Sequence, residues 1–124
     1  FSSAQETIAL SAMYGTNHFP GMRGIASLTE RGTTPTMMSR LSSGLPIFAL
    51  SRKADTLQRL ALCRGVIPLF FDSTAFAPQD LEARTIEFLV DGGYLARGDY
   101  ILLTMGGAHG ESGKTDLMKI LPVE

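Results

Sequence analysis

Short apolar runs alternate with segments of helical periodicity along the 124-residue chain, and this alternation constrains the fold more than any other feature. Each run has the length of a single strand and lacks the polar alternation of a strand with one solvent-exposed face. The predicted strands are 24–29, 45–51, 66–71, 100–105 and 117–123. Continuous apolar strands separated by helices are typical of a parallel sheet that is covered on both faces.

The predicted helices are 2–18, 33–43, 53–65 and 78–93. The first has one face of small side chains at the spacing i, i+3, i+4, i+7, formed by Ala9, Ala12, Met13 and Thr16. Thr34 is expected to cap the second helix, with Pro35 in the first helical position. Gly65 is expected to end the third helix, and the pair Gly92 and Gly93 the fourth.

The connection between the last two predicted strands has no helical pattern and is rich in glycine. A short connection of this kind joins antiparallel strands, because parallel strands need a longer crossover. We therefore expect a single α/β domain over residues 1–124. Its predicted architecture is a three-layer α/β/α sandwich with a five-stranded mixed sheet, mostly parallel, whose last strand is antiparallel.

Composition excludes several classes of protein. With 44% hydrophobic and 19% charged residues, the chain is expected to form a globular domain. A formal net charge of −1 predicts no binding to nucleic acid, and no apolar run reaches the roughly 20 residues that span a membrane. Cys63 has no second cysteine to pair with, and with two histidines it forms no metal-binding set. We expect a cytoplasmic domain with no metal or cofactor of its own, and a first residue of Phe1 suggests a piece of a longer protein.

The segment GGAHGESGKT, residues 106–115, is one residue short of a P-loop, because Ala108 stands where that motif begins with glycine. A P-loop opens a helix, whereas the residues after Thr115 have the pattern of a strand, which disfavours a small nucleotide-hydrolysing enzyme. Two alternatives remain. The segment is a plain hairpin turn with a solvated Lys114, or a nest of backbone amides that binds an anion beside that lysine.

The segment TERGTT, residues 29–34, follows the first predicted strand and leads into a helix. Ligands of open α/β sheets bind at the carboxyl ends of strands, and a helix N-terminus favours anions. Three hydroxyls, on Thr29, Thr33 and Thr34, could donate to phosphate oxygens, and Arg31 could form a bidentate pair. The alternative is that Thr34 and Pro35 form a helix cap that binds no ligand.

Six elements together resemble the C-terminal domain of bacterial pyruvate kinases. They are the small-residue helix before the first strand, LTE-x-G-x-T at 28–34, SR-x-SSG-x-PIFA-x-SR at 39–52, L-x-RGV-x-P at 62–68, GD-x-x-x-x-T at 98–104, and SG-x-T at 112–115 with M-x-x-x-PV at 118–123. The resemblance covers nearly the whole chain and follows the order of its strands and helices. It implies the regulatory and assembly domain of a glycolytic enzyme that converts phosphoenolpyruvate and ADP to pyruvate and ATP, with Mg²⁺ and K⁺. It also implies that the catalytic residues lie on a TIM barrel and a lid domain of the same polypeptide, and that none lies in this chain.

The resemblance further implies a phosphorylated effector bound between the two polar loops. The residues it assigns to the phosphate are Thr29, Arg31, Gly32, Thr33, Thr34, Ser112, Gly113 and Lys114, with Arg52, His109 and Glu111 as further candidate contacts. The common loop of the family reads T-E-S-G-[RK]-[ST], so that here Arg31 replaces a small hydroxyl and Thr33 a basic residue. Because Glu30 would repel a second phosphate, we expect a sugar monophosphate or AMP as the effector, and not fructose 1,6-bisphosphate.

The resemblance also implies a homo-oligomer that forms through the last strand, at the edge of the sheet, and through the N-terminal helix. An apolar edge strand such as 117–123 needs a cover or a partner. A free-standing phosphate-binding module of the same fold is the alternative to a domain of pyruvate kinase.

Overall fold

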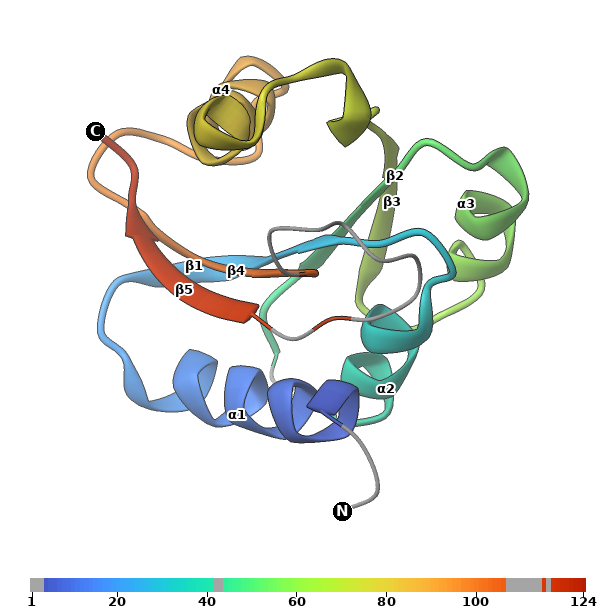
Figure 1. Ribbon diagram of the computed structural model, residues 1–124. Helices are drawn as coiled ribbons and strands as arrows, with labels where there is room; N and C mark the ends of the chain where they lie inside the picture. The colour runs from blue at the N-terminus through green and yellow to red at the C-terminus, as the bar shows by residue number, and fades with distance from the viewer. Residues whose placement is uncertain (1–3, 42–43, 107–114, 116) are drawn as a thin grey trace.

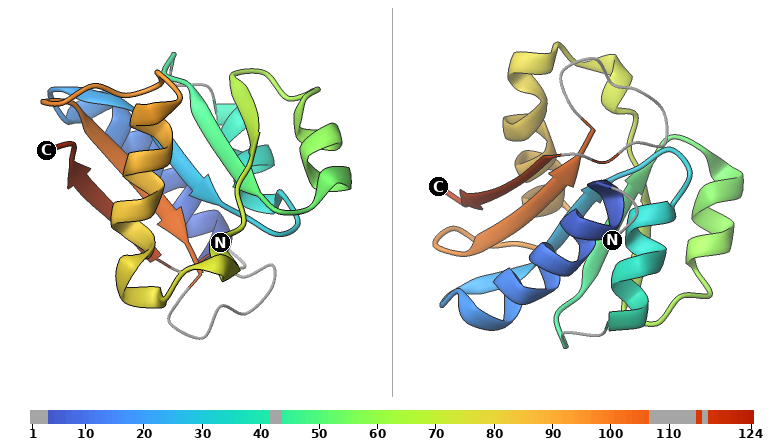
Figure 2. Two further views of the ribbon diagram at one scale, coloured as in Figure 1. Left: turned by 90° about the horizontal axis from the view of Figure 1, so that it is seen from above. Right: turned by 60° about the horizontal axis from the view of Figure 1, so that its bottom comes forward.

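The computed structural model describes residues 4–41, 44–106, 115 and 117–124. It contains one five-stranded sheet with helices on both faces (Figures 1 and 2). The helices are α1 (Ala4–His18), α2 (Thr33–Leu41), α3 (Ala54–Leu60) and α4 (Leu81–Asp91), and two 3-10 turns, Ser73–Ala75 and Pro78–Asp80, precede α4. The strands are β1 (Met22–Leu28), β2 (Ile47–Ser51), β3 (Val66–Phe70), β4 (Tyr100–Met105) and β5 (Leu117–Pro122).

The strand order in the sheet is β3-β2-β1-β4-β5. Neighbouring strands from β3 to β4 are parallel, and β4 and β5 are antiparallel. The predicted α/β/α sandwich with an antiparallel last strand is therefore confirmed.

The direction in which the chain steps through the sheet decides which face each helix covers. The chain steps from β1 to β2 and on to β3 in one direction, and right-handed crossovers place α2 and α3 on the same face. The step from β3 back to β4 reverses this direction, so that α4 lies on the opposite face. Figure 2 shows α4 on one side of the sheet and α1 and α2 on the other.

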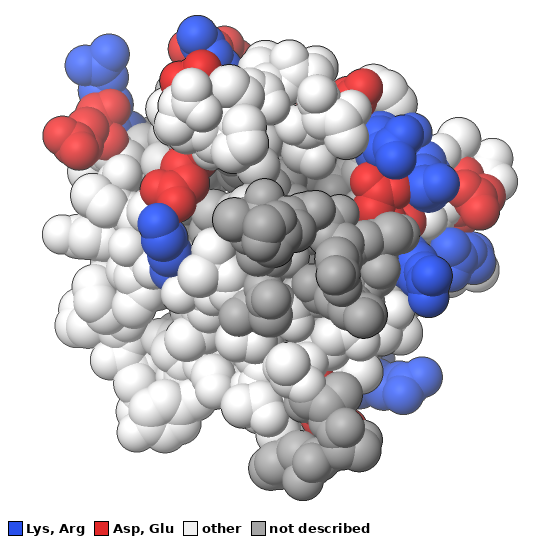
Figure 3. Space-filling model, viewed as in Figure 1, with Lys and Arg blue, Asp and Glu red and all other residues white. Residues whose placement is uncertain are grey.

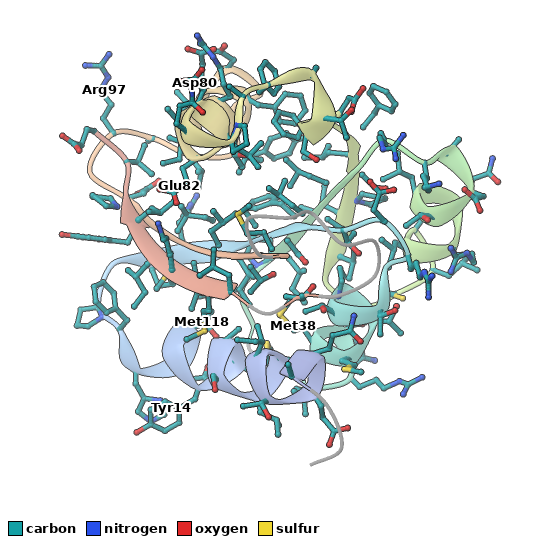
Figure 4. All side chains as sticks on the ribbon, viewed as in Figure 1. Tyr14, Met38, Asp80, Glu82, Arg97 and Met118 are labelled. Atoms are coloured by element: carbon teal, nitrogen blue, oxygen red, sulfur yellow. The ribbon has the colours of Figure 1, made fainter. Side chains whose placement is uncertain are left out.

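Two apolar cores lie on the two faces of the sheet, which explains why the central strands are continuously apolar. Towards α4, the largest fully buried side chains are Phe48, Leu50, Leu89, Ile101 and Leu103. Towards α1 and α2, Ile25, Ile47 and Leu102 pack with Ala9, Ala12, Met13 and Met38. The predicted small face of α1 is therefore its buried face. Figure 4 shows Met38 and Met118 between the sheet and these two helices.

The third helix is shorter than predicted. It ends at Leu60, and Gly65 has a different role from the expected helix end. The φ angle of Gly65 is 75°, and its carbonyl accepts a hydrogen bond of 2.8 Å from the backbone N–H of Ile47. Gly65 therefore starts the pairing of β3 with β2. The end of the fourth helix is as predicted, since Gly92 caps it and Gly93 has a φ of 82°.

Candidate anion-binding site

The loop after β1, residues 29–32, lies between two adjacent strands, β1 and β4, whose following connections lead to opposite sides of the sheet. From β1 the chain proceeds towards β2, and from the adjacent β4 it proceeds towards β5, on the other side. In open α/β sheets, ligands bind in the crevice that such a divergence leaves at the carboxyl ends of the strands. The predicted segment TERGTT thus lies at the position where this fold class binds ligands.

Hydrogen bonds within the loop fix its shape. The backbone N–H of Thr29 donates to the carbonyl of Leu50 at 2.9 Å, which ties the start of the loop to β2. The backbone N–H of Gly32 donates to the side-chain oxygen of Thr29 at 2.8 Å. Gly32 has a φ of 83°, and a Cβ atom there would lie 3.2 Å from Leu60 of α3. The loop therefore needs glycine both for its backbone conformation and for its close contact with α3.

The predicted cap of the second helix is wrong. Helix α2 begins at Thr33, and the carbonyl of Gly32 accepts its first backbone bond, from Thr36, at 3.1 Å. The residue before the helix is therefore Gly32, and Thr34 lies inside the first turn. The reason is that Thr29 closes the turn with its own hydroxyl, so that the helix starts earlier than the Thr-Pro pair indicated.

Thr34 instead has a buried hydroxyl without a partner. The residue is only 1% exposed, and no hydrogen bond to its side-chain oxygen is found in the described part of the chain. Met38, one turn later, packs in the core beneath α2, so Thr34 faces the sheet as well. The backbone N–H groups of Thr33 and Thr34 belong to the first turn, whose donors have no partner within a helix.

Ser27 and Thr104 carry two further buried hydroxyls at the same end of the sheet. They are register partners on β1 and β4, both are 0% exposed, and neither hydroxyl has a partner among the described residues. Each follows a core residue of the α1–α2 face, Ile25 or Leu102, by two positions and therefore lies on that face. Sequence analysis missed both, although a polar residue inside a continuous apolar run is the signal that would have identified them.

Within the described part of the chain, the buried side-chain polar atoms without a hydrogen-bond partner are on Ser27, Glu30, Thr34 and Thr104, and the Glu30 oxygen among them lies 3.8 Å from Nζ of Lys53. All four residues belong to the carboxyl ends of β1 and β4 or to the segment that follows β1. Buried polar groups in folded proteins are nearly always hydrogen-bonded, so such a local concentration calls for an explanation. A bound polar ligand at this end of the sheet would provide one.

Charged side chains surround the loop. The Glu30 carboxylate lies 3.0 Å from Nε of Arg52 and 3.8 Å from Nζ of Lys53, which places the predicted contact residue Arg52 beside the loop. Arg31 is exposed. Figure 3 shows basic and acidic side chains interleaved on the side of the molecule where α3 lies. The Arg52 and Lys53 side chains are 44% and 46% exposed and that of Glu30 is 20% exposed, so solvent screens the two cations more than the carboxylate and the pairs contribute little to stability.

The structure brings together six of the predicted site residues: Thr29, Arg31, Gly32, Thr33, Thr34 and Arg52. Ser112, Gly113, Lys114, His109 and Glu111 lie outside the described residues. The described residues that follow this segment form strand β5 and not a helix, so the helix that a P-loop requires is not found there. Among the described residues, no three His, Cys, Asp or Glu side chains are grouped to hold a metal ion. Within the same residues, no helix is long and apolar enough to cross a membrane.

The fold and the loop define the class of protein: an open α/β domain with a helix N-terminus presented at the carboxyl ends of parallel strands. The family described as "Pyruvate kinase, alpha/beta domain" matches residues 6–121, and the chain belongs to this family. It is 45% identical over its whole length to pyruvate kinase II of Salmonella typhimurium and 42% identical to a pyruvate kinase of Haemophilus influenzae. The chain spans about a quarter of the length of these relatives, 26% and 25% respectively. The resemblance to the C-terminal domain of bacterial pyruvate kinases is thereby confirmed.

Proposed function

We propose that this domain regulates a pyruvate kinase by binding a phosphorylated effector at loop 29–32 and the first turn of α2. The observation that carries the proposal is the buried hydroxyl of Thr34 at the N-terminus of that helix, which has no hydrogen-bond partner among the described residues. The positive end of the helix dipole and the free first-turn N–H groups favour an anion at this point. A phosphate oxygen would accept the hydrogen bonds for which the described residues provide no acceptor.

The charges around the loop favour an effector with a single phosphate. The Thr29 hydroxyl accepts from Gly32 and keeps its own proton for donation, and the exposed Arg31 can approach the same anion. Glu30 already balances part of the charge of Arg52 and Lys53. A second phosphate close to Glu30 would be repelled. We therefore favour a sugar monophosphate or AMP.

The activity of the whole enzyme is proposed from the relatives, which are named pyruvate kinases. In this proposal a catalytic barrel and a lid, outside residues 1–124, transfer phosphate from phosphoenolpyruvate to ADP in the cytoplasm. The described residues offer no group of three His, Cys, Asp or Glu side chains that could hold Mg²⁺. A free-standing module would bind the same effector without these domains.

A thermal-shift panel tests effector binding. The ligands are ribose 5-phosphate, glucose 6-phosphate, AMP, fructose 1,6-bisphosphate and ATP, with inorganic phosphate as the control. A ligand at about 100 times its Kd adds about 2.7 kcal/mol to the free energy of unfolding, which is several degrees in Tm for a small domain. We expect a monophosphate to raise the Tm of the wild type and not that of Thr34→Val. If no phosphorylated ligand shifts the wild type, this chain has no effector site of its own.

We also propose that the domain assembles through the free edge of β5, and the two edges of the sheet differ in a way that supports this. Gly65 and Phe71, which flank β3, bond to β2. Because alternate residues of a strand bond to opposite sides, the nitrogen of Pro68 faces outward, and it carries no N–H. Val123, just after β5, bonds to Gly98 and Asp99, just before β4. Met118 and Ile120 therefore direct their N–H groups outward, and Pro122, at the end of the strand, faces outward without one. Proline therefore interrupts the β3 edge at its centre, whereas Pro122 is the last residue of β5 and leaves the edge before it open to a second strand.

The face around β5 has the surface that a second copy would need. Figure 3 shows almost no charged side chains over β5 and α1. Ile120 on β5 is 39% exposed and Tyr14 on α1 is 66% exposed. The charged residue of β5, Lys119, is paired with Glu82 of α4 at 2.6 Å, so a second strand beside β5 would not meet an unpaired charge there.

Proline substitutions at adjacent residues of β5 separate assembly from folding. Ile120→Pro removes an outward N–H and leaves the ladder with β4 intact, whereas Leu121→Pro removes a donor directed at β4. We expect a folded monomer from Ile120→Pro and a destabilised chain from Leu121→Pro, measured by sedimentation velocity and circular dichroism. A wild type that is monomeric at high concentration would contradict assembly by this domain alone.

A further inference from the structure

Helix α3 is hydrogen-bonded to the backbone of loop 29–32, although the two segments are far apart in sequence. The side-chain hydroxyl of Thr56 donates to the carbonyl of Glu30 at 2.7 Å. The guanidinium of Arg59 donates to the carbonyl of Arg31 at 3.3 Å and to the hydroxyl of Thr56 at 3.1 Å. Leu60 of the same helix packs against Gly32. Each residue from Glu30 to Gly32 therefore contacts α3.

The direction of these bonds is fixed by chemistry. A guanidinium can only donate, so the oxygen of Thr56 must accept from Arg59. A hydroxyl has a single proton, and that proton is then left for the carbonyl of Glu30. The result is a directed chain from Arg59 through Thr56 to the loop. Thr56 is 1% exposed, so that water does not compete for the bond.

These bonds determine which way the carbonyl oxygens of Glu30 and Arg31 are directed, and this affects whether an anion can approach the loop. A carbonyl oxygen carries partial negative charge and would repel a phosphate at a short distance. Because the carbonyls of Glu30 and Arg31 accept bonds from α3, they are directed towards that helix and held there. The first-turn N–H groups of α2 are then left as the polar backbone groups that an anion meets.

We infer that Thr56, oriented by Arg59, is a positioning residue that holds loop 29–32 in the shape that receives the anion. This inference rests on the proposed effector site. It adds residues of α3 that do not touch the ligand and act only through the carbonyls of the loop.

The matched variants are Thr56→Val and Thr85→Val. Both threonines are 1% exposed and both donate to a backbone carbonyl, at 2.7 Å for Thr56 and at 2.8 Å for Thr85, but Thr85 bonds to Leu81 within its own helix. Thr56→Ser keeps the hydroxyl and serves as the rescue. The first readout is the exchange rate of the Gly32 amide, which the side chain of Thr29 protects, measured by NMR without ligand. The second is the Kd of ribose 5-phosphate, with inorganic phosphate as the simplest probe.

We expect Thr56→Val to raise the exchange rate of Gly32 and the Kd about tenfold each, with both restored in Thr56→Ser and unchanged in Thr85→Val. Equal effects of Thr56→Val and Thr85→Val on both readouts would overturn the inference, because loss of a buried hydrogen bond would then explain them. If the wild type binds neither probe but only Thr56→Val exposes Gly32, the proposed effector site fails while the positioning of the loop by α3 stands.

Discussion

Replacing Thr34 by valine should stabilise the ligand-free domain, which is the opposite of what removing a threonine from a helix cap would do. The hydroxyl is buried and has no partner among the described residues, and the side chain packs towards the sheet. A buried donor without a partner costs about 1–3 kcal/mol. Valine has nearly the same shape and a similar helix propensity, so little is lost in exchange.

We expect a gain of about 1 kcal/mol in the free energy of unfolding, at the lower end of that range because the valine methyl must fit where an oxygen lay. For a domain of this size the gain corresponds to roughly 4 °C in Tm. Thr85→Val is the control, because its hydroxyl donates to Leu81 at 2.8 Å from an equally buried position. That variant should lose about 1 kcal/mol.

Urea unfolding followed by circular dichroism measures both variants, and an unchanged m-value would show that the comparison is valid. A loss in Thr34→Val as large as that in Thr85→Val would refute the reasoning, because the Thr34 hydroxyl would then have a partner in the folded chain. A stabilised variant that no longer responds to a phosphorylated ligand would show that the hydroxyl is retained for binding at the expense of stability.

Two further substitutions test the loop and its surroundings. Gly32→Ala should lower the free energy of unfolding by about 2 kcal/mol, because φ is 83° and the new Cβ would lie 3.2 Å from Leu60. Gly65→Ala, with a φ of 75° and open space around it, should lower it by about 1 kcal/mol. Equal losses of the two variants in urea unfolding would argue against the contact with Leu60. The Asp72 carboxylate accepts bonds from the hydroxyl and the N–H of Thr74, and these hold its pKa below the usual 3.8. The stabilisation from a lowered pKa is present above the unfolded pKa and is lost as pH falls through the folded pKa. Asp72→Ala should therefore be less stable than the wild type at about pH 6, and the difference should shrink as the pH is lowered below 3.8.

The sequence predicts where the candidate site lies, but not the role of each residue in it. TERGTT could be located because three hydroxyls follow an apolar strand and precede a helix. The role of its last threonine, Thr34, could not be predicted. Whether the hydroxyl of Thr29 or that of Thr34 accepts a backbone N–H at the start of the helix depends on the backbone path through Gly32. Thr56 and Arg59 could not be found either. They are ordinary polar residues of a helix, and only packing of α3 against the loop brings them to it.

The sequence by itself determined the elements, their order and the class of fold. Apolar runs with strand length, the small face of α1 and the glycine-rich last connection are local patterns, and each follows from the geometry of its own segment. Tertiary structure alone decided that β4 lies beside β1, which pairs Ser27 with Thr104 and makes the carboxyl end of β1 the point of divergence. The physical reason is that strand order depends on how both faces of the sheet are covered at once, a condition that no single segment carries.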